Sequence, residues 1–161
     1  MALTKTQVIV IVAVVVAAAA YWAVDRFVVT EKKRVEAAVE QLRDSVARGD
    51  LRAFAACIST SYSDDTFSAD KLLSLAGKFF ETRGAIDVTL NDKRVAINGT
   101  SASVRGAVTI RTQSGYWGRS EWQVDFQRET DGVWRVIRLT PLRFGGKDVT
   151  GWGDAVRGAG M

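Results

Sequence analysis

The hydrophobic pattern of this chain divides it into three stretches with different periods. Residues 8–24 (VIVIVAVVVAAAAYWAV) carry no charge. Within residues 30–83, apolar side chains recur at three- and four-residue spacing, which indicates amphipathic helices. From residue 86 onward the spacing changes to two, which is typical of strands that bury one face. The pattern therefore predicts an apolar helix, then amphipathic helices, then a sheet.

The uncharged stretch 8–24 predicts a single membrane-spanning helix. Its seventeen residues span about 25 Å as a helix, somewhat short of the hydrocarbon layer of about 30 Å, so a thin bilayer would accommodate it. Tyr21 and Trp22 are residue types that lie at membrane interfaces. The alternative is a cleaved signal peptide, because Lys5 precedes the run and alanines 18–20 form a small-residue cleavage site. We favour the uncleaved anchor, since the apolar run continues past these alanines.

The flanking charges give opposite indications of membrane orientation. Basic residues after the span, at position 26 and at 32–34, outnumber Lys5 and the α-amino group before it, which places the following domain in the cytoplasm. The signal-like order of Lys5 and the apolar run favours the other side. Residues 32–34 are also explained as the solvated face of the next helix. We therefore favour an extracytoplasmic domain on a single-pass membrane protein.

Three amphipathic helices are predicted after the anchor, over residues 30–48, over 51–58 and after residue 68. Asp50 and Ser68 are good N-cap residues for the second and third helices. The apolar stripes are expected at Leu51, Phe54, Ala55 and Ile58 in the second helix and at Leu72, Leu75, Ala76 and Phe79 in the third.

Four to five antiparallel strands are predicted after the helices. Alternating apolar residues occur within 86–90, 95–97, 102–110, 122–126 and 133–140. Asn98-Gly99 is a two-residue hairpin signal, and Asp131-Gly132 predicts a turn that leads into the last run. Helices followed by strands indicate an α+β domain in which the helices cover one face of a curved sheet.

Composition removes several classes of chemistry. The 161 residues include one cysteine and no histidine, which excludes Cys/His zinc sites, histidine-dependent triads and an internal disulfide. We expect Cys57 to be a small buried hydrophobe, and we expect no metal and no cofactor. The chain has 22 basic and 18 acidic residues, a net charge of +4, and acidic residues are interleaved with the arginines of the strands. This predicts cross-strand ion pairs and no nucleic-acid binding.

The helical part and the last strands resemble the nuclear transport factor 2-like superfamily and its SnoaL-like branch. The resemblance rests on ARGDLRAFAACI, which begins at residue 47, and on RETDGVWRVIRLTPL, which begins at residue 128. It covers residues 30–142. It implies a cone-shaped domain, in which a strongly bent sheet wraps around the helices and leaves an apolar pocket at the open end. Some members are isomerases, dehydratases or cyclases, and others are binding or scaffolding modules.

Enzymatic branches of that superfamily often use an Asp-His dyad or an aspartate base with a tyrosine. Asp87, Asp125, Tyr62 and Tyr116 are the candidates by residue type. Both aspartates alternate with apolar neighbours, which predicts that they face away from the core. We therefore expect a non-enzyme.

The aromatic residues suggest two further sites. Trp122, Phe126 and Trp134 form either a ligand pocket or simply the core. Tyr116 and Trp117, beside a glycine-flanked loop, are either contacts with a protein partner or a headgroup region, or a structural cap of the hairpin. Trp152, in a glycine-rich tail, is either an anchor on a partner or an incidental residue of a disordered end.

The expected organisation is an anchor over residues 1–29, the cone-shaped domain over 30–143 and a glycine-rich tail over 144–161. We expect a non-catalytic accessory or scaffold subunit, bound to the lipid bilayer through residues 8–24 and acting through protein subunits of a membrane complex or through self-association. The alternative is a binder of a small apolar ligand, or a histidine-free isomerase or dehydratase, that uses the cavity of the cone.

Overall fold

A computed structural model describes the backbone of residues 5–83, 86–111, 117–144 and 147–149. The side chains of 5–13, 19–29, 83 and 117 are outside this description. The chain divides into two compact units, Met1–Lys33 and Arg34–Met161. Its elements, in chain order, are α1 (Lys5–Arg48), α2 (Leu51–Cys57), α3 (Ala69–Arg83), β1 (Asp87–Asn98), β2 (Ser101–Arg111), β3 (Trp117–Arg128), β4 (Trp134–Phe144) and β5 (Lys147–Asp148).

Helix α1 is continuous over 44 residues. The sequence predicts an anchor and a separate helix from residue 30, whereas the backbone remains helical between them because residues 25–29 include no proline or glycine. The boundary between the compact units falls after Lys33, close to the expected boundary after residue 29. Among the helices of the described residues, none has the length and apolar character required to cross a membrane.

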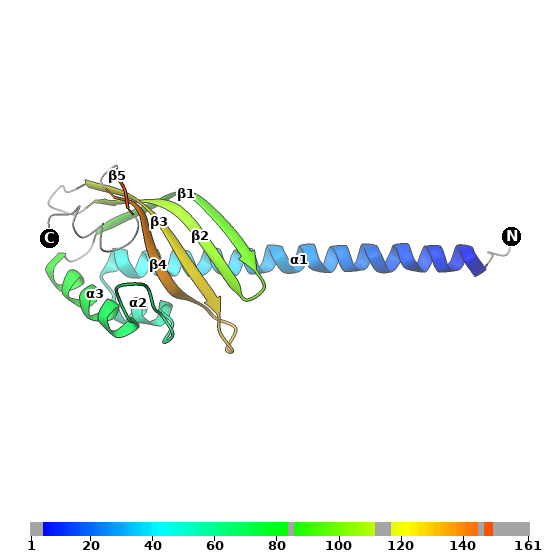
Figure 1. Ribbon diagram of the computed structural model, residues 1–161, viewed down its shortest axis with the longest axis horizontal. Helices are drawn as coiled ribbons and strands as arrows, with labels where there is room; N and C mark the ends of the chain where they lie inside the picture. Colours follow the sequence, from blue (N-terminus) through cyan, green and yellow to red (C-terminus); the bar gives the residue numbers. More distant parts are fainter. Residues whose placement is uncertain (1–4, 84–85, 112–116, 145–146, 150–161) are drawn as a thin grey trace. The chain divides into compact units, whose positions relative to one another are not determined.

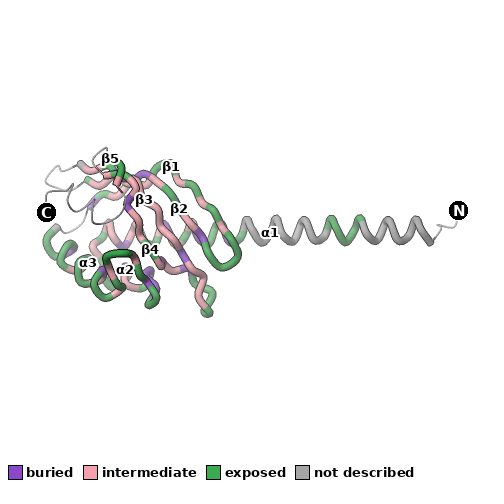
Figure 2. Tube along the Cα trace, viewed as in Figure 1, coloured by how far each residue is buried: buried purple, intermediate pink, exposed green. Residues whose placement is uncertain are grey.

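The sheet has five antiparallel strands in sequential order, β1-β2-β3-β4-β5, so every neighbouring pair is consecutive in the chain (Figure 1). This α+β order confirms the predicted fold class. Val35 and Val39 of α1 pack with α2, α3 and the inner face of the sheet in one core. Figure 2 shows buried positions in the strands and helices and in the loop after α2, while the hairpin between β1 and β2 is exposed.

A bulge in β1 explains why its two apolar runs differ in parity. Leu90 and Val95 are five residues apart, yet both pack against the core. The register with β2 shifts between Asn91 and Arg94, and Asp92 adopts a φ of 53°. From Asn91 to Arg94 strand β1 advances three residues while β2 advances two, so one extra residue bends β1 and returns Val95 to the inner face. The two predicted runs are therefore one strand.

The hairpin between β1 and β2 lies one residue later than its strongest sequence signal. Asn98 pairs with Ser101, so the two-residue loop is Gly99-Thr100. Gly99 has a φ of 60°, which matches the first central position of a type II′ turn. In the connection between β3 and β4, Gly132 has a φ of 80°, so the Asp131-Gly132 signal does mark a turn.

Three predicted core positions of the helices are wrong. Leu51, Leu75 and Phe79 are 40%, 43% and 39% exposed. In α3 the residues that face the core are spaced four apart, at Leu72, Ala76 and Phe80. The buried face is therefore rotated relative to the predicted stripe, and Leu75 and Phe79 lie outside it. Asp50 caps α2 as predicted, because its carboxylate accepts a hydrogen bond from the Ala53 amide at 2.9 Å.

Strand β4 includes Phe144, and β5 follows it within the segment that the sequence assigns to a glycine-rich tail. Arg143 and Phe144 pair with Asp148 and Lys147, and the Val149 amide donates to the Leu142 carbonyl at 3.0 Å. Backbone hydrogen bonds to a strand edge require no apolar side chains, so the apolar content of this segment does not reveal them.

Candidate functional site

The inner side of the sheet is occupied by the aromatic residues that the sequence assigns to a pocket or to the core. Phe126 and Trp134 are 1% and 4% exposed and belong to the core cluster, together with Tyr62. Trp122 is half-buried, and its indole N–H donates to the Ser120 hydroxyl at 2.7 Å. Phe126 and Trp134 therefore serve as packing groups, and a ligand at these residues stays a prediction.

Tyr62 is engaged in fixing the loop between α2 and α3. Its hydroxyl donates a hydrogen bond to Asp64. The other oxygen of that carboxylate accepts from the amides of Thr66 and Phe67 at 2.7 and 2.6 Å. The Tyr62 hydroxyl and the Asp64 carboxylate therefore both stabilise the turn in this loop.

Asp87 and Asp125 lie on the face of the sheet opposite to the core, as their alternation predicts. Asp87 is exposed at the start of β1. Asp125 is half-buried in β3, where its neighbours across the strands are Ser103 of β2 and Arg138 of β4. These three side chains form one row on the outer face of the sheet.

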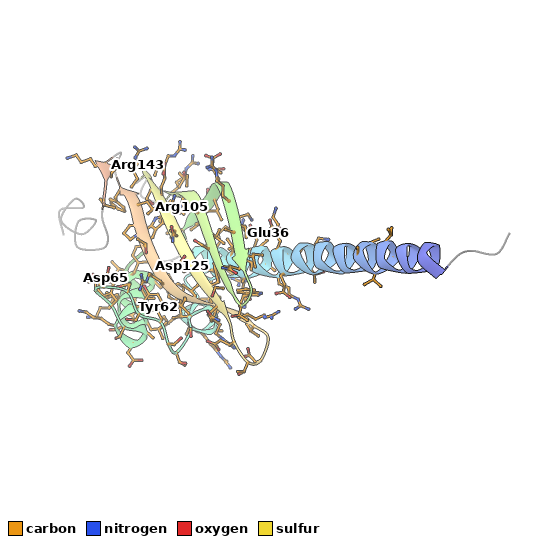
Figure 3. The ribbon with its side chains drawn as sticks, turned by 45° about the vertical axis from the view of Figure 1, so that its right-hand side comes forward. Glu36, Tyr62, Asp65, Arg105, Asp125 and Arg143 are labelled. Atoms are coloured by element: carbon orange, nitrogen blue, oxygen red, sulfur yellow. The ribbon has the colours of Figure 1, made fainter. Side chains whose placement is uncertain are left out.

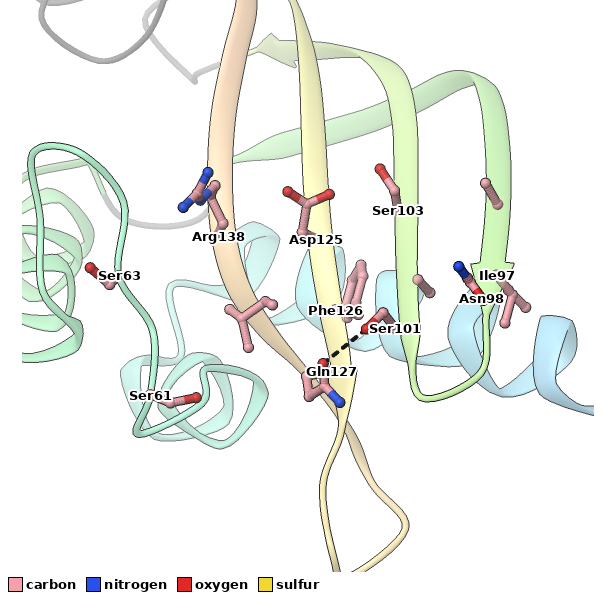
Figure 4. A pocket seen from close by; sticks show the side chains of 13 residues that line it. Ser61, Ser63, Ile97, Asn98, Ser101, Ser103, Asp125, Phe126, Gln127 and Arg138 are labelled. Carbon is pink, nitrogen blue, oxygen red and sulfur yellow. Dashed lines mark hydrogen bonds between the residues drawn. The ribbon is translucent and has the colours of Figure 1, made fainter.

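A hollow of about 780 Å³ lies over this row (Figure 4). Its polar lining includes Ser61, Ser63, Ser103, Asp125, Gln127 and Arg138. The volume lies within the range of about 300–1,000 Å³ that is usual for small-molecule sites. A hollow on the outer face, in which these polar groups are set among apolar residues such as Ile97 and Ile137, is therefore the candidate site.

One wall of the hollow depends on a bulge in β4. Asp125 pairs with Arg138 while Phe126 pairs with Val136, so Ile137 is the extra residue. The Ile137 carbonyl accepts a hydrogen bond from the Ser63 amide at 3.1 Å, and Val136 accepts one from the Ser59 amide at 2.9 Å. The loop after α2 thus follows the edge of β4 and brings Ser61 and Ser63 beside the outer face.

Side-chain hydrogen bonds connect the polar residues along this face. Arg105 donates from its Nε to Gln123 at 3.1 Å, and the amide of Gln123 donates to Asp125 at 3.0 Å. Figure 3 shows Arg105 and Asp125 on the same side of the sheet. Ser101 donates to Gln127 at 3.1 Å. The face offers hydroxyl, amide, guanidinium and carboxylate groups, a set suited to binding polar ligands.

Cys57 is buried in α2, as the sequence predicts, and its thiol donates to the Ala53 carbonyl at 3.3 Å. Burial raises the pKa of the thiol above its ordinary value of 9.0, although the positive charge of Arg135 opposes this. The thiol therefore remains protonated at neutral pH. Within the described part of the chain, no three His, Cys, Asp or Glu side chains gather as metal ligands.

The other predicted contact residues lie outside the described side chains. This applies to Tyr116 and Trp152 entirely, and to the side chains of Tyr21, Trp22 and Trp117. Their roles stay predictions.

Sequence reasoning missed the hollow itself. The alternation of Ser101 and Ser103 with Ala102 and Val104 correctly predicts which face of β2 is polar and which is buried. The bulge at Ile137 and the course of the loop with Ser61 and Ser63 depend on tertiary contacts, so no local pattern reveals them.

No model of a protein family and no curated protein matches the sequence. Among solved structures, Bd1075 from Bdellovibrio bacteriovorus matches with a TM-score of 0.65 and 12% identity, over 71% of this chain and 42% of that chain. An NTF2-like family protein from Streptomyces avermitilis, provisionally named a dehydratase, matches with a TM-score of 0.61 and 17% identity, over 68% and 93% of the two chains. An NTF2-like protein with a cystatin-like fold from Novosphingobium aromaticivorans gives 0.63 and 17%, over 78% and 90%.

These structures identify the fold of the domain as NTF2-like, also called cystatin-like. The expected fold is therefore confirmed. Sequence identities of 12–17% show a shared fold and do not assign the activity of these proteins to this chain.

Proposed function

We propose that this chain is a non-catalytic, membrane-anchored accessory or scaffold subunit that contacts a protein partner, or a second copy of itself, through the outer face of its sheet. The observation that carries the proposal is the position of the hollow. It lies over Ser103, Asp125 and Arg138 on the outer face, whereas Phe126 and Trp134 fill the inner side.

The positions of the acidic and phenolic groups support a non-catalytic role. A base that removes a proton from an apolar substrate works best in an apolar cavity, where its pKa is tuned. Asp125 instead accepts a hydrogen bond from Gln123 on the outer face, and Tyr62 is committed to Asp64. The chain has no histidine to act in their place.

The membrane anchor is supported by the chemistry of residues 8–24. This stretch is uncharged. Val14, Val15 and Val16 are each exposed by 60% or more of their surface. Consecutive exposed valines are unfavourable in water and favourable in lipid. We propose that Tyr21 and Trp22 mark one interface and that the domain lies on the extracytoplasmic side.

Site-specific photo-cross-linking in native membranes tests the contact face. A benzoylphenylalanine residue at position 103 places the reactive group beside the hollow, and the same residue at the exposed position 74 of α3 is the matched control. We expect a discrete protein adduct, or a covalent dimer of this chain, from position 103 and none from position 74. Equal adducts from both positions, or none from position 103, would contradict the proposal.

A further inference from the structure

Two arginines lie directly opposite each other on the outer face of the sheet. Arg94 of β1 pairs with Arg105 of β2, and both side chains are exposed. Among the described residues, no carboxylate forms an ion pair with either one, and Arg105 contacts only the amide oxygen of Gln123. Like charges placed directly opposite each other destabilise an antiparallel strand pair. The fold alone therefore gives no reason for this pairing.

Other arginines of the same face are neutralised by carboxylates. Arg143 contacts Asp148 at 2.9 Å and Glu121 at 3.7 Å. Arg119 contacts Asp92 at 3.7 Å. These pairs confirm the predicted mixture of cross-strand charges, and they show that the exception at Arg94 and Arg105 is local.

The uncompensated positive charge continues to the hollow. Arg138 is exposed beside Asp125, and no ion pair joins these two among the described residues. Through Gln123, Asp125 is also connected to Arg105. Three guanidinium groups and one carboxylate thus lie on four consecutive strands of the outer face, with Asp125 directly opposite Arg138 only. We define Arg94, Arg105, Asp125 and Arg138 as the arginine surface.

We propose that the arginine surface binds an acidic peptide segment of the partner, an inference that rests on the proposed function. Guanidinium groups bind carboxylates in a planar, two-pronged geometry, so acidic side chains satisfy the three arginines. Asp125 accepts one hydrogen bond, from Gln123, and its carboxylate has further acceptor capacity that a peptide N–H fills. A phosphodiester backbone offers no such donor. The mixed surface therefore favours an acidic peptide over a nucleic acid.

Binding of a labelled hexaglutamate peptide to the purified full-length chain in detergent tests this inference. We expect Arg94→Glu to weaken binding by about tenfold or more, because a carboxylate replaces a recognising arginine. The same change is expected to raise the midpoint of thermal unfolding, since it places an acidic residue opposite Arg105 in place of a like charge. A purely structural role of Arg94 predicts the opposite shift in stability. Arg52→Glu, on the exposed surface of α2, is the control with the same change in net charge.

The inference is overturned if Arg94→Glu and Arg52→Glu bind hexaglutamate equally well, or if a six-nucleotide DNA strand binds the wild type as tightly as hexaglutamate does. A cross-link from position 103 without hexaglutamate binding would reject the acidic ligand and leave the proposed contact face in place. Absence of that cross-link would reject the contact face, regardless of whether hexaglutamate binds.

Discussion

Ser59 donates a hydrogen bond to Glu129 at 2.6 Å, although the two residues are seventy positions apart in the chain. Ser59 is 1% exposed and follows α2, and Glu129 ends the strand pair at the turn between β3 and β4. Arg135 donates to the second oxygen of Glu129. This contact fixes the loop that forms one wall of the hollow to the sheet.

Removing the Ser59 hydroxyl should destabilise the domain. Ser59→Ala leaves one oxygen of Glu129 without its buried donor, which we expect to cost about 1–3 kcal/mol of unfolding free energy. Urea denaturation measures this difference. Ser74→Ala, at an exposed position of α3, should stay within about 0.5 kcal/mol of the wild type. Equal effects of the two changes would contradict a structural role for the contact.

Acid should reduce the contribution of Asp131 to stability. Its hydrogen bond from Arg135, and next the one from the Val133 amide, lower the pKa of Asp131 below its ordinary value of 3.8. A lowered pKa in the folded state means that the stabilisation is present above pH 3.8 and is lost as the pH falls through the folded value.

The unfolding free energies of wild type and Asp131→Asn should therefore differ by a constant amount between about pH 6 and 7 and converge below about pH 4. Denaturant titrations at each pH measure this. A difference that grows as the pH falls would contradict the sign of the pKa shift.

Two glycines should respond to alanine in opposite directions. At Gly106 a Cβ atom would lie 2.9 Å from Leu90 Cδ1 and 3.2 Å from the Asn91 carbonyl, so we expect Gly106→Ala to destabilise by about 1–3 kcal/mol. At Gly77, inside α3, the nearest atom is Leu51 Cδ2 at 3.3 Å, and Leu51 is partly exposed and able to move. Gly77→Ala should stabilise by up to about 1 kcal/mol through helix propensity. Thermal unfolding of both variants checks the signs.

Cys57 should react slowly in the folded protein. Burial raises the pKa of its thiol, so little thiolate is present near pH 8. We expect a disulfide-exchange reagent to label the native chain at least about tenfold more slowly than the chain in denaturant. Similar rates in both conditions would show that the thiol is accessible in the native state.

The order of helices and strands could be predicted from the sequence because each depends on local periodicity. The change of parity between Leu90 and Val95 even marks the bulge in β1, although it is also consistent with two separate strands. The exposure of Leu75 and Phe79 could not be predicted, because both belong to an apolar helical stripe and only packing selects which row faces the core.

The candidate site was less accessible to sequence reasoning. Alternation places Asp125 on the outer face, and the register then sets it beside Ser103 and Arg138. The opposition of Arg94 and Arg105 follows the regular ladder from Asn98 and Ser101, and the bulge lies beyond it. That ladder depends on Gly99-Thr100 forming the loop, whereas the Asn98-Gly99 signal predicts a loop one residue earlier.

Protection of position 103 in native membranes tests the central claim most directly. Ser103→Cys and Ser74→Cys, each in a Cys57→Ala background, are labelled with a maleimide in permeabilised membranes and again in a detergent that separates the subunits. We predict that labelling at position 103 is at least about tenfold slower in membranes than in detergent, because the partner covers the outer face, while position 74 reacts equally in both. Equal labelling of position 103 in both conditions would contradict the claim that this face is the contact surface.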